Sequence, residues 1–233
     1  MSGFVNLTEN EIYERMVATI LNHSLPPGTK LVEDRLASAF GVSRTRIRPV
    51  LVRLANEQIV TLTPNRGATV SQPSEKEAHE VFEVRRMIEP TLIQCFIANA
   101  KDDDIAQLAS CIADEEAARA SGDMPRAIRL SGDFHLHIAN AADHQTLGRI
   151  LRELVSRTSL ILMTYSFNHK QARIEATACG CQQHHGLLDA IRCRDAQAAA
   201  RLMREHLEQL ESQLRFKPPG TEPPDLMALF SPD

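Results

Sequence analysis

The spacing of hydrophobic positions changes along the first 72 residues. Apolar residues recur every three to four positions in residues 7–23 and again in a segment that ends near Asn56, which predicts amphipathic helices. Residues 59–71 instead combine β-branched residues with a Pro-Asn-Arg-Gly turn at 64–67, which predicts a β-hairpin. The N-terminal part is therefore expected to be a small domain of helices that ends in a hairpin.

Helical spacing dominates the rest of the chain, which has few strand-forming residues. The Gln-Pro-Ser-Glu junction at 72–75 breaks the chain and provides a helix start. The predicted helices cover residues 75–99, 102–121, 124–142, 145–167, 171–194 and 195–216. The expected fold class is mostly α, with a first domain at 1–72 and an all-α helical bundle at 73–217. The Pro-rich tail at 218–233 is expected to be extended, and its apolar end could dock on the bundle or on a second subunit.

A sharp turn followed by a basic helix stands out in the N-terminal domain. Gly41 lies where two short helices must turn and where a positive φ costs glycine little. Val42 is expected to be buried in this turn, and Ser43 is expected to cap the following helix. The residues expected to contact DNA phosphates and grooves are Arg35, Ser43, Arg44, Thr45, Arg46, Arg48 and, at the hairpin tip, Arg66 and Gly67.

A solvated helix face is the ordinary explanation for such a run of arginines. Here, however, the positive charges crowd a helix N-terminus, where the helix dipole disfavours cations unless an anion is expected. The basic character is also local, since residues 1–72 hold 8 basic and 6 acidic residues whereas the remainder holds 18 and 24. The pattern therefore favours a DNA-reading surface that is confined to the N-terminal domain.

Composition also predicts where the protein resides. No segment approaches the roughly 18 uninterrupted apolar residues of a membrane span, and the N-terminus lacks a signal-peptide pattern. A cytoplasmic protein without a membrane partner is expected. The five cysteines lack zinc-finger spacing and are expected to be reduced. Cys179 and Cys181 leave open a redox or soft-metal role beside ordinary helix packing.

Three histidines are the candidate chemistry of the bundle. His135, His184 and His206 each lie among apolar residues on a different predicted helix. Three inward imidazoles would form half of an octahedral site for zinc, nickel or a similar ion. The alternative is that each is an ordinary core or interface histidine. Helical spacing places the two rivals, His137 and His185, off the inward faces.

Residues 7–72 resemble the DNA-binding domain of GntR-family bacterial transcription regulators. The resemblance rests on Leu-Ala at 36–37, Gly-Val-Ser-Arg-Thr at 41–45, Arg48 and Arg-Gly-Ala at 66–68. Two residues depart from the usual pattern, Pro49 directly after Arg48 and Asp34 where an arginine is often found in the preceding helix. The resemblance implies a winged helix-turn-helix that binds double-stranded operator DNA.

Residues 78–210 resemble the ligand-sensing FCD domain of the FadR-type subfamily of these regulators. In its metal-binding versions an aspartate stands four residues before the first histidine, and Ser131 occupies that position here. The resemblance implies that His135, His184 and His206 bind a divalent transition metal, zinc or nickel. Because serine is a poor ligand, the site would be completed by water and an effector carboxylate, or by a carboxylate from another helix.

The first bundle helix resembles the subfamily segment in which an arginine, followed four residues later by a glutamate, faces the effector pocket. Arg85 and Glu89 occupy these positions. The guanidinium of Arg85 could bind an effector carboxylate through two parallel hydrogen bonds, with Ser131 as a second effector-binding residue. Alternatively, Arg85 and Glu89 could form an ordinary surface pair one helical turn apart.

The expected function is that of a DNA-binding transcriptional regulator, in the first instance a repressor, and not an enzyme. A homodimer would read a near-palindromic operator, and a small carboxylate effector in the bundle would change the spacing of the DNA domains through the linker at 63–75. Two alternatives remain: a regulator whose helical domain only dimerises, and a metal-dependent hydrolase that uses the three histidines to activate water.

Overall fold

The computed structural model describes residues 7–21, 24–64, 66–165 and 172–216, with backbone alone for residue 21 and for 172–179. The chain divides at residue 72 into an N-terminal unit and a helical unit. The expected tail at 218–233 lies outside the described residues. The predicted fold class, mostly α with a winged helix-turn-helix before an all-helical bundle, is confirmed.

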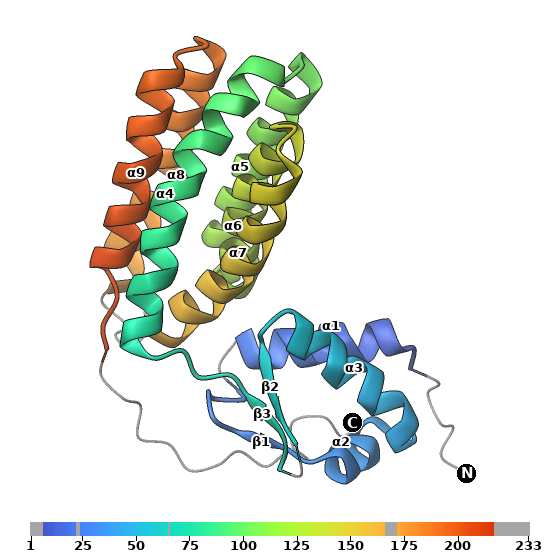
Figure 1. The fold of residues 1–233 in the computed structure, drawn as a ribbon. Helices are drawn as coiled ribbons and strands as arrows, with labels where there is room; N and C mark the ends of the chain where they lie inside the picture. Colours follow the sequence, from blue (N-terminus) through green and yellow to red (C-terminus); the bar gives the residue numbers. More distant parts are fainter. Residues whose placement is uncertain (1–6, 22–23, 65, 166–171, 217–233) are drawn as a thin grey trace. The chain divides into compact units, whose positions relative to one another are not determined.

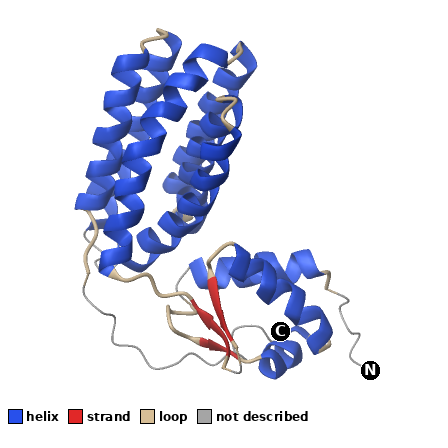
Figure 2. Cartoon of the chain, viewed as in Figure 1, coloured by secondary structure: helices blue, strands red, loops and turns tan. Residues whose placement is uncertain are grey.

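The N-terminal unit packs three helices against a small sheet (Figure 2). In chain order its elements are α1 (Glu9–Leu21), β1 (Lys30–Leu31), α2 (Glu33–Phe40), α3 (Arg44–Asn56), β2 (Val60–Thr63) and β3 (Gly67–Val70). Apolar side chains that recur at helical spacing form its core, among them Ile12, Met16, Leu36, Ile47 and Leu54. Gly41 ends α2 in the left-handed conformation with φ of 65°, as its position in the turn predicts.

Three details of this unit differ from the sequence expectations. The sheet has the order β1-β3-β2, and its strand β1 lies in a segment that reads as a linker. A two-residue strand has no periodicity to detect, since pairing with Thr69 and Ala68 alone defines it. Val42 is half-buried rather than buried. Ser43 occupies the N-cap position of α3, but its side chain makes no capping hydrogen bond.

The helical unit is a bundle in which α4 contacts α6, α7 and α9, while α5 packs against α6 and α8 (Figure 1). Its helices are α4 (Glu75–Asn99), α5 (Asp102–Ala120), α6 (Met124–Ala141), α7 (Gln145–Tyr165), α8 (Ala172–Arg192) and α9 (Ala196–Ser212). Capping side chains set several of the starts. Ser74 accepts a hydrogen bond from the Glu77 amide at the start of α4, and Asp195 accepts one from Ala198 in α9. A continuous apolar core that includes Phe82, Phe96 and Phe134 fills the bundle.

Candidate metal centre and DNA-contacting surface

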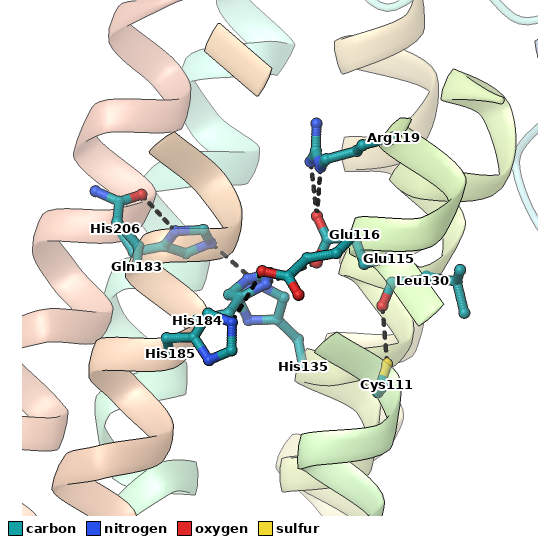
Figure 3. Close-up of polar contacts among 10 residues, drawn as sticks. All are labelled: Cys111, Glu115, Glu116, Arg119, Leu130, His135, Gln183, His184, His185 and His206. Carbon is teal, nitrogen blue, oxygen red and sulfur yellow. Dashed lines mark hydrogen bonds and ion pairs between the residues drawn. The ribbon is translucent and has the colours of Figure 1, made fainter. Parts of the chain in front are cut away.

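The three predicted histidines come together inside the bundle. His135 of α6, His184 of α8 and His206 of α9 are 2%, 0% and 0% exposed, and one ring nitrogen of each lies within 4.8 Å of the others. Figure 3 shows their imidazoles converging from separate helices. The Nε2 atoms of His135 and His206 are 3.3 Å apart. The sequence prediction that these residues meet is confirmed, because the apolar face of each helix turns its histidine into the core.

The other nitrogen of each ring is held by a side-chain oxygen. The contacts are His135 Nδ1 to Glu89 Oε2 at 2.5 Å, His184 Nδ1 to Glu115 Oε2 at 2.9 Å, and His206 Nδ1 to Gln183 Oε1 at 2.9 Å. Carboxylate and amide oxygens only accept hydrogen bonds, so each Nδ1 carries the hydrogen and donates it. In the neutral ring this leaves the Nε2 atom with a lone pair, and the three lone pairs point toward one another.

Burial favours the neutral form of His135 and His206 in the folded protein. Burial lowers the pKa of His135 and outweighs the neighbouring carboxylate of Glu89. Burial also lowers the pKa of His206, and the other two histidines lower it further. For Glu89 burial alone would raise the pKa, but the charge of Arg85 and the hydrogen bonds from His135 and Arg85 prevail and lower it to about 2. The centre therefore combines two imidazoles with lowered pKa, those of His135 and His206, with the ionised carboxylate of Glu89.

A third layer of side chains fixes the groups that hold the histidines. The contacts are Arg85 Nε to Glu89 Oε1 at 2.5 Å, Arg119 Nη2 to Glu115 Oε1 at 2.6 Å, and a hydrogen bond from the Gln183 amide to Gln209. Figure 3 shows the pair formed by Arg119 and Glu115. Outer partners of this kind orient metal-binding histidines and set their tautomer. Spacing of four residues within one helix was the only sequence signal for the pair of Glu115 and Arg119, and nothing in the pattern indicated Gln183 or Gln209.

The donor set fits a divalent transition metal. Two nitrogens bound at about 2.0–2.1 Å to one tetrahedral zinc ion lie roughly 3.3–3.4 Å apart. The spacing of 3.3 Å between His135 and His206 matches that value. The Nε2 atom of His184 is buried and has no hydrogen-bond partner among the described residues. Buried polar atoms are normally satisfied, so this nitrogen has the character of a metal ligand.

Ser131 occupies the position at which the metal-binding versions of the FCD domain carry an aspartate ligand. Ser131 lies one turn before His135 on α6 and is half-buried. The sequence left open that a carboxylate from another helix completes the site. Glu89 and Glu115 do reach the histidines from other helices, but they contact the Nδ1 atoms of His135 and His184 and not the Nε2 atoms that face the proposed metal position. Among the described residues, the cluster with metal-ligand spacing contains the three histidines alone.

Arg85 does not form the surface pair that the sequence left open. It pairs with Glu89, but the two side chains are only 3% and 2% exposed. The helix α4 is packed by α6, α7 and α9, which buries a face that a single-helix pattern cannot assign. The Nη2 atom of Arg85 is buried without a hydrogen-bond partner among the described residues. Arg85 therefore both orients Glu89 and retains a donor for another acid.

The rival residues have other surroundings. His185 is exposed and contacts Glu116 at 2.9 Å, as its helical position predicts, and His137 is half-buried. Burial raises the pKa of the Cys181 thiol to about 11, which describes an unreactive packing residue. The side chain of Cys179 lies outside the described residues.

The predicted DNA-contacting residues lie in three places: Arg35 on α2, residues 43–48 at the start of α3, and Arg66 and Gly67 at the hairpin tip. Seven of them are exposed, namely Arg35, Ser43, Arg44, Thr45, Arg48, Arg66 and Gly67, while Arg46 is half-buried. The Oγ atom of Ser43 lies 2.6 Å from Oγ1 of Thr45, so the two hydroxyls bind each other instead of capping the helix. Gly67 has a φ of 86°, which permits the tight hairpin tip. No described helix is long and apolar enough to cross a membrane.

Comparisons with known proteins agree with both units. Residues 8–70 match the family described as "Bacterial regulatory proteins, gntR family", and residues 80–209 match the FCD domain. The chain is 23% identical over 205 residues to the HTH-type transcriptional repressor RspR of Escherichia coli K12, covering 88% of each chain. It is 27% identical over 210 residues to the repressor GlaR of the same strain, covering 87% of this chain and 94% of GlaR.

Solved structures show the same fold. The E. coli protein McbR/YncC superposes with a TM-score of 0.72 at 21% identity, over 91% of this chain and 99% of that chain. A putative GntR regulator from Rhodococcus sp. RHA1 gives a TM-score of 0.72 at 21% identity, over 88% and 96%.

Proposed function

The chain belongs to the gntR family of bacterial regulatory proteins and carries an FCD domain, and from this premise we propose that it is a homodimeric repressor controlled by a small carboxylate effector. The family and the relatives are transcriptional regulators that bind DNA rather than enzymes. RspR and GlaR are both named as transcriptional repressors, which supports repression rather than activation for this chain. A two-fold dimer would place two α3 helices in successive major grooves of one operator.

The observation that carries the proposal is the convergence of three buried imidazoles, whose Nδ1 atoms are already held and whose Nε2 atoms keep a lone pair. His184 Nε2 has no hydrogen-bond partner among the described residues, and the outer Nδ1 contacts prevent the rings from turning away. A zinc or nickel ion held there would relieve the repulsion between the lone pairs and leave coordination positions for water or an effector oxygen. His135, His184 and His206 are the proposed ligands.

The charge of the site supports an acidic effector. The buried Arg85 and the half-buried Arg119 are balanced by the carboxylates Glu89 and Glu115, and burial lowers the pKa of His135 and His206. With Ser131 in place of a carboxylate ligand, a divalent ion would leave the site with two excess positive charges. A small carboxylate would reduce this excess and could accept a hydrogen bond from the spare Nη2 of Arg85. We assign Arg85 and Ser131 to the effector-binding side of the site.

The described contacts offer a route from this site to the linker. His206 lies on α9, and five residues later Glu211 accepts contacts from Arg86 and His79 of α4. Tyr165 at the end of α7 donates a hydrogen bond to the carbonyl of Pro73, where the linker enters the bundle. An effector would change operator affinity only by binding the two arrangements of these helices unequally, typically by about 1 to 3 kcal/mol.

Metal analysis of the purified, untagged protein tests the proposal. We expect near-stoichiometric zinc or nickel by inductively coupled plasma mass spectrometry, lost in His135→Ala and retained in the matched control His185→Ala. Absence of metal from the wild type, even after addition of excess zinc or nickel, would overturn the three-histidine site and leave either a metal-free effector domain or a bundle that only dimerises.

A DNA-binding measurement tests the control by effector. An operator is selected from a random-sequence DNA pool with the metal-loaded protein, and its affinity is measured with and without a panel of small mono- and dicarboxylic acids. A weakening of about 5-fold to 150-fold by one class of acid, absent in Arg85→Lys, is the expected result. Affinity that no acid changes would contradict the effector proposal but not the metal site.

A further inference from the structure

Two acidic side chains of α2 contact two of the arginines expected to read DNA. We propose that Glu33 and Asp34 are positioning residues that hold Arg48 and Arg44 and thereby increase discrimination between the operator and other DNA. This inference rests on the family's DNA binding and is independent of the metal site.

The contacts join two helices through the edge of each guanidinium. Arg48 Nε lies 2.9 Å from Glu33 Oε2, and Arg44 Nε lies 3.0 Å from Asp34 Oδ1. A weaker contact of 3.4 Å joins Arg44 Nη1 to Asp34 Oδ2. The partners are 15 and 10 residues apart in the chain, so the pairs depend on the packing of α2 against α3 and not on the periodicity of one helix.

Both arginines remain accessible to a ligand. The side chains of Arg44 and Arg48 are 59% and 64% exposed. Exposed ion pairs contribute little to folding stability, because water and salt screen them. A structural purpose is therefore a weak explanation for two such pairs on the same surface.

The geometry of the Arg48 contact suits the reading of a base. The carboxylate of Glu33 takes the Nε hydrogen, which leaves the two terminal Nη groups directed away from the pair. These are the groups that donate together to O6 and N7 of guanine in the major groove. A guanidinium held by a carboxylate loses less conformational freedom when it binds, so the correct base is bound more strongly than by a mobile arginine.

The same carboxylates weaken binding to other DNA. Binding without sequence preference comes mainly from cations that neutralise phosphates and release counterions. Two negative charges beside Arg44 and Arg48 offset part of that attraction. Orientation and charge thus act in the same direction, and both raise the ratio of nonspecific to operator dissociation constants.

Fluorescence anisotropy with the full-length protein provides the test. Glu33→Gln and Asp34→Asn are compared with wild type on a selected operator and on a scrambled duplex of equal length, over a series of salt concentrations. Glu14→Gln is the matched control, because Glu14 is an exposed acid on α1 of the same unit. In Glu33→Gln we expect the ratio of the nonspecific to the operator dissociation constant to fall about fivefold or more. On scrambled DNA, the slope of log affinity against log salt concentration should steepen by about 1.

Glu33→Asp separates positioning from charge. The shorter side chain keeps the charge but cannot reach Arg48 in the same way, so the ratio should fall while the salt dependence stays at the wild-type value. Equal tightening on both DNAs in Glu33→Gln, as a purely electrostatic effect would give, overturns the proposal. A ratio in Glu33→Gln and Asp34→Asn that matches the Glu14→Gln control also overturns it. Circular dichroism and thermal melting verify that every variant is folded.

Discussion

Glu115 of α5 holds His184 of α8 by a contact of 2.9 Å between Oε2 and Nδ1, and both side chains are completely buried. Burial alone would raise the pKa of Glu115, but the hydrogen bond from His184 and the charge and hydrogen bond of Arg119 lower it below its ordinary value. An ionised carboxylate behind the ring increases the basicity of the nitrogen on the opposite side. The relationship therefore connects a residue that is not a ligand to the strength of the proposed metal site.

Glu115→Gln tests this connection. The amide keeps the shape of the side chain but removes the charge, so zinc affinity should fall about 10-fold to 100-fold. Competition with a chromophoric chelator measures the affinity. Glu116→Gln is the matched control, because Glu116 pairs with the exposed His185 at 2.9 Å. Equal affinity of Glu115→Gln and wild type would contradict the role of the buried carboxylate.

Ser131→Asp should restore a carboxylate one turn before His135. We expect tighter zinc binding, because an anionic oxygen would join three neutral nitrogens, and weaker binding of carboxylic acids, because the charge of the site falls. Chelator competition gives the first value and thermal stabilisation by small acids gives the second. Ser131→Asn is the control, because it adds a similar volume without a charge. It should neither tighten zinc binding nor weaken the binding of carboxylic acids through charge. If Ser131→Asp left both values unchanged, Ser131 would not face the metal.

The metal-free protein should lose stability as the pH falls below about 6.5. His135 and His206 have a folded pKa below the ordinary value of 6.5, so the unfolded chain binds more protons than the folded chain below that pH. The contribution of these two histidines to the free energy of unfolding is fully present above the unfolded pKa. As the pH falls below that value, the free energy of unfolding decreases by up to about 1.4 kcal/mol per pH unit for each histidine. Urea unfolding of chelator-treated protein between pH 7.5 and about 5 measures the slope.

The matched variants for this pH dependence are His206→Asn and His185→Asn. Removing the buried ring should reduce the slope, whereas removing the exposed ring of His185 should leave it unchanged. A slope that is the same in wild type and His206→Asn would show that His206 does not remain neutral in the folded bundle.

Gly132→Ala should destabilise the bundle by about 1 to 3 kcal/mol. A Cβ atom at Gly132 would lie 2.8 Å from Cγ1 of Val155, so α6 and α7 would have to move apart. Gly186→Ala on α8 is the control, since nothing lies within 4 Å of its Cβ position and alanine favours a helix by up to about 1 kcal/mol. Thermal unfolding measures both. A second change, Val155→Ala, should restore part of the stability of Gly132→Ala.

Much of the fold follows from local sequence. The six bundle helices begin and end within a few residues of their predicted bounds, because helical periodicity, capping residues and the breaks at Gly122, Asp143 and Arg194 are all local signals. Strand β1 escapes such reasoning because only its partner β3 defines it. Ser43 shows the same limit on a smaller scale, since Thr45 binds the hydroxyl that would otherwise cap the helix.

The candidate site was predictable only in its innermost layer. Each histidine lies on an apolar helix face, which places all three in the core, but their distance from one another depends on how α6, α8 and α9 pack. The contacts of Glu89 and Glu115 with these rings span 46 and 69 residues of sequence. No periodicity records such pairings, and the burial of Arg85 is likewise a property of the bundle and not of α4 alone.

The order of synthesis imposes a sequence of events on the proposed site. The described helices and strands of the DNA-contacting unit all precede residue 73, whereas the third nitrogen belongs to His206 on α9, the last helix that the structure describes. A growing chain therefore acquires the means to bind DNA long before it can hold an ion with all three rings. Premature termination or proteolysis before α9 would yield fragments that retain the arginines of α3 but lack the three-ring site that could govern them.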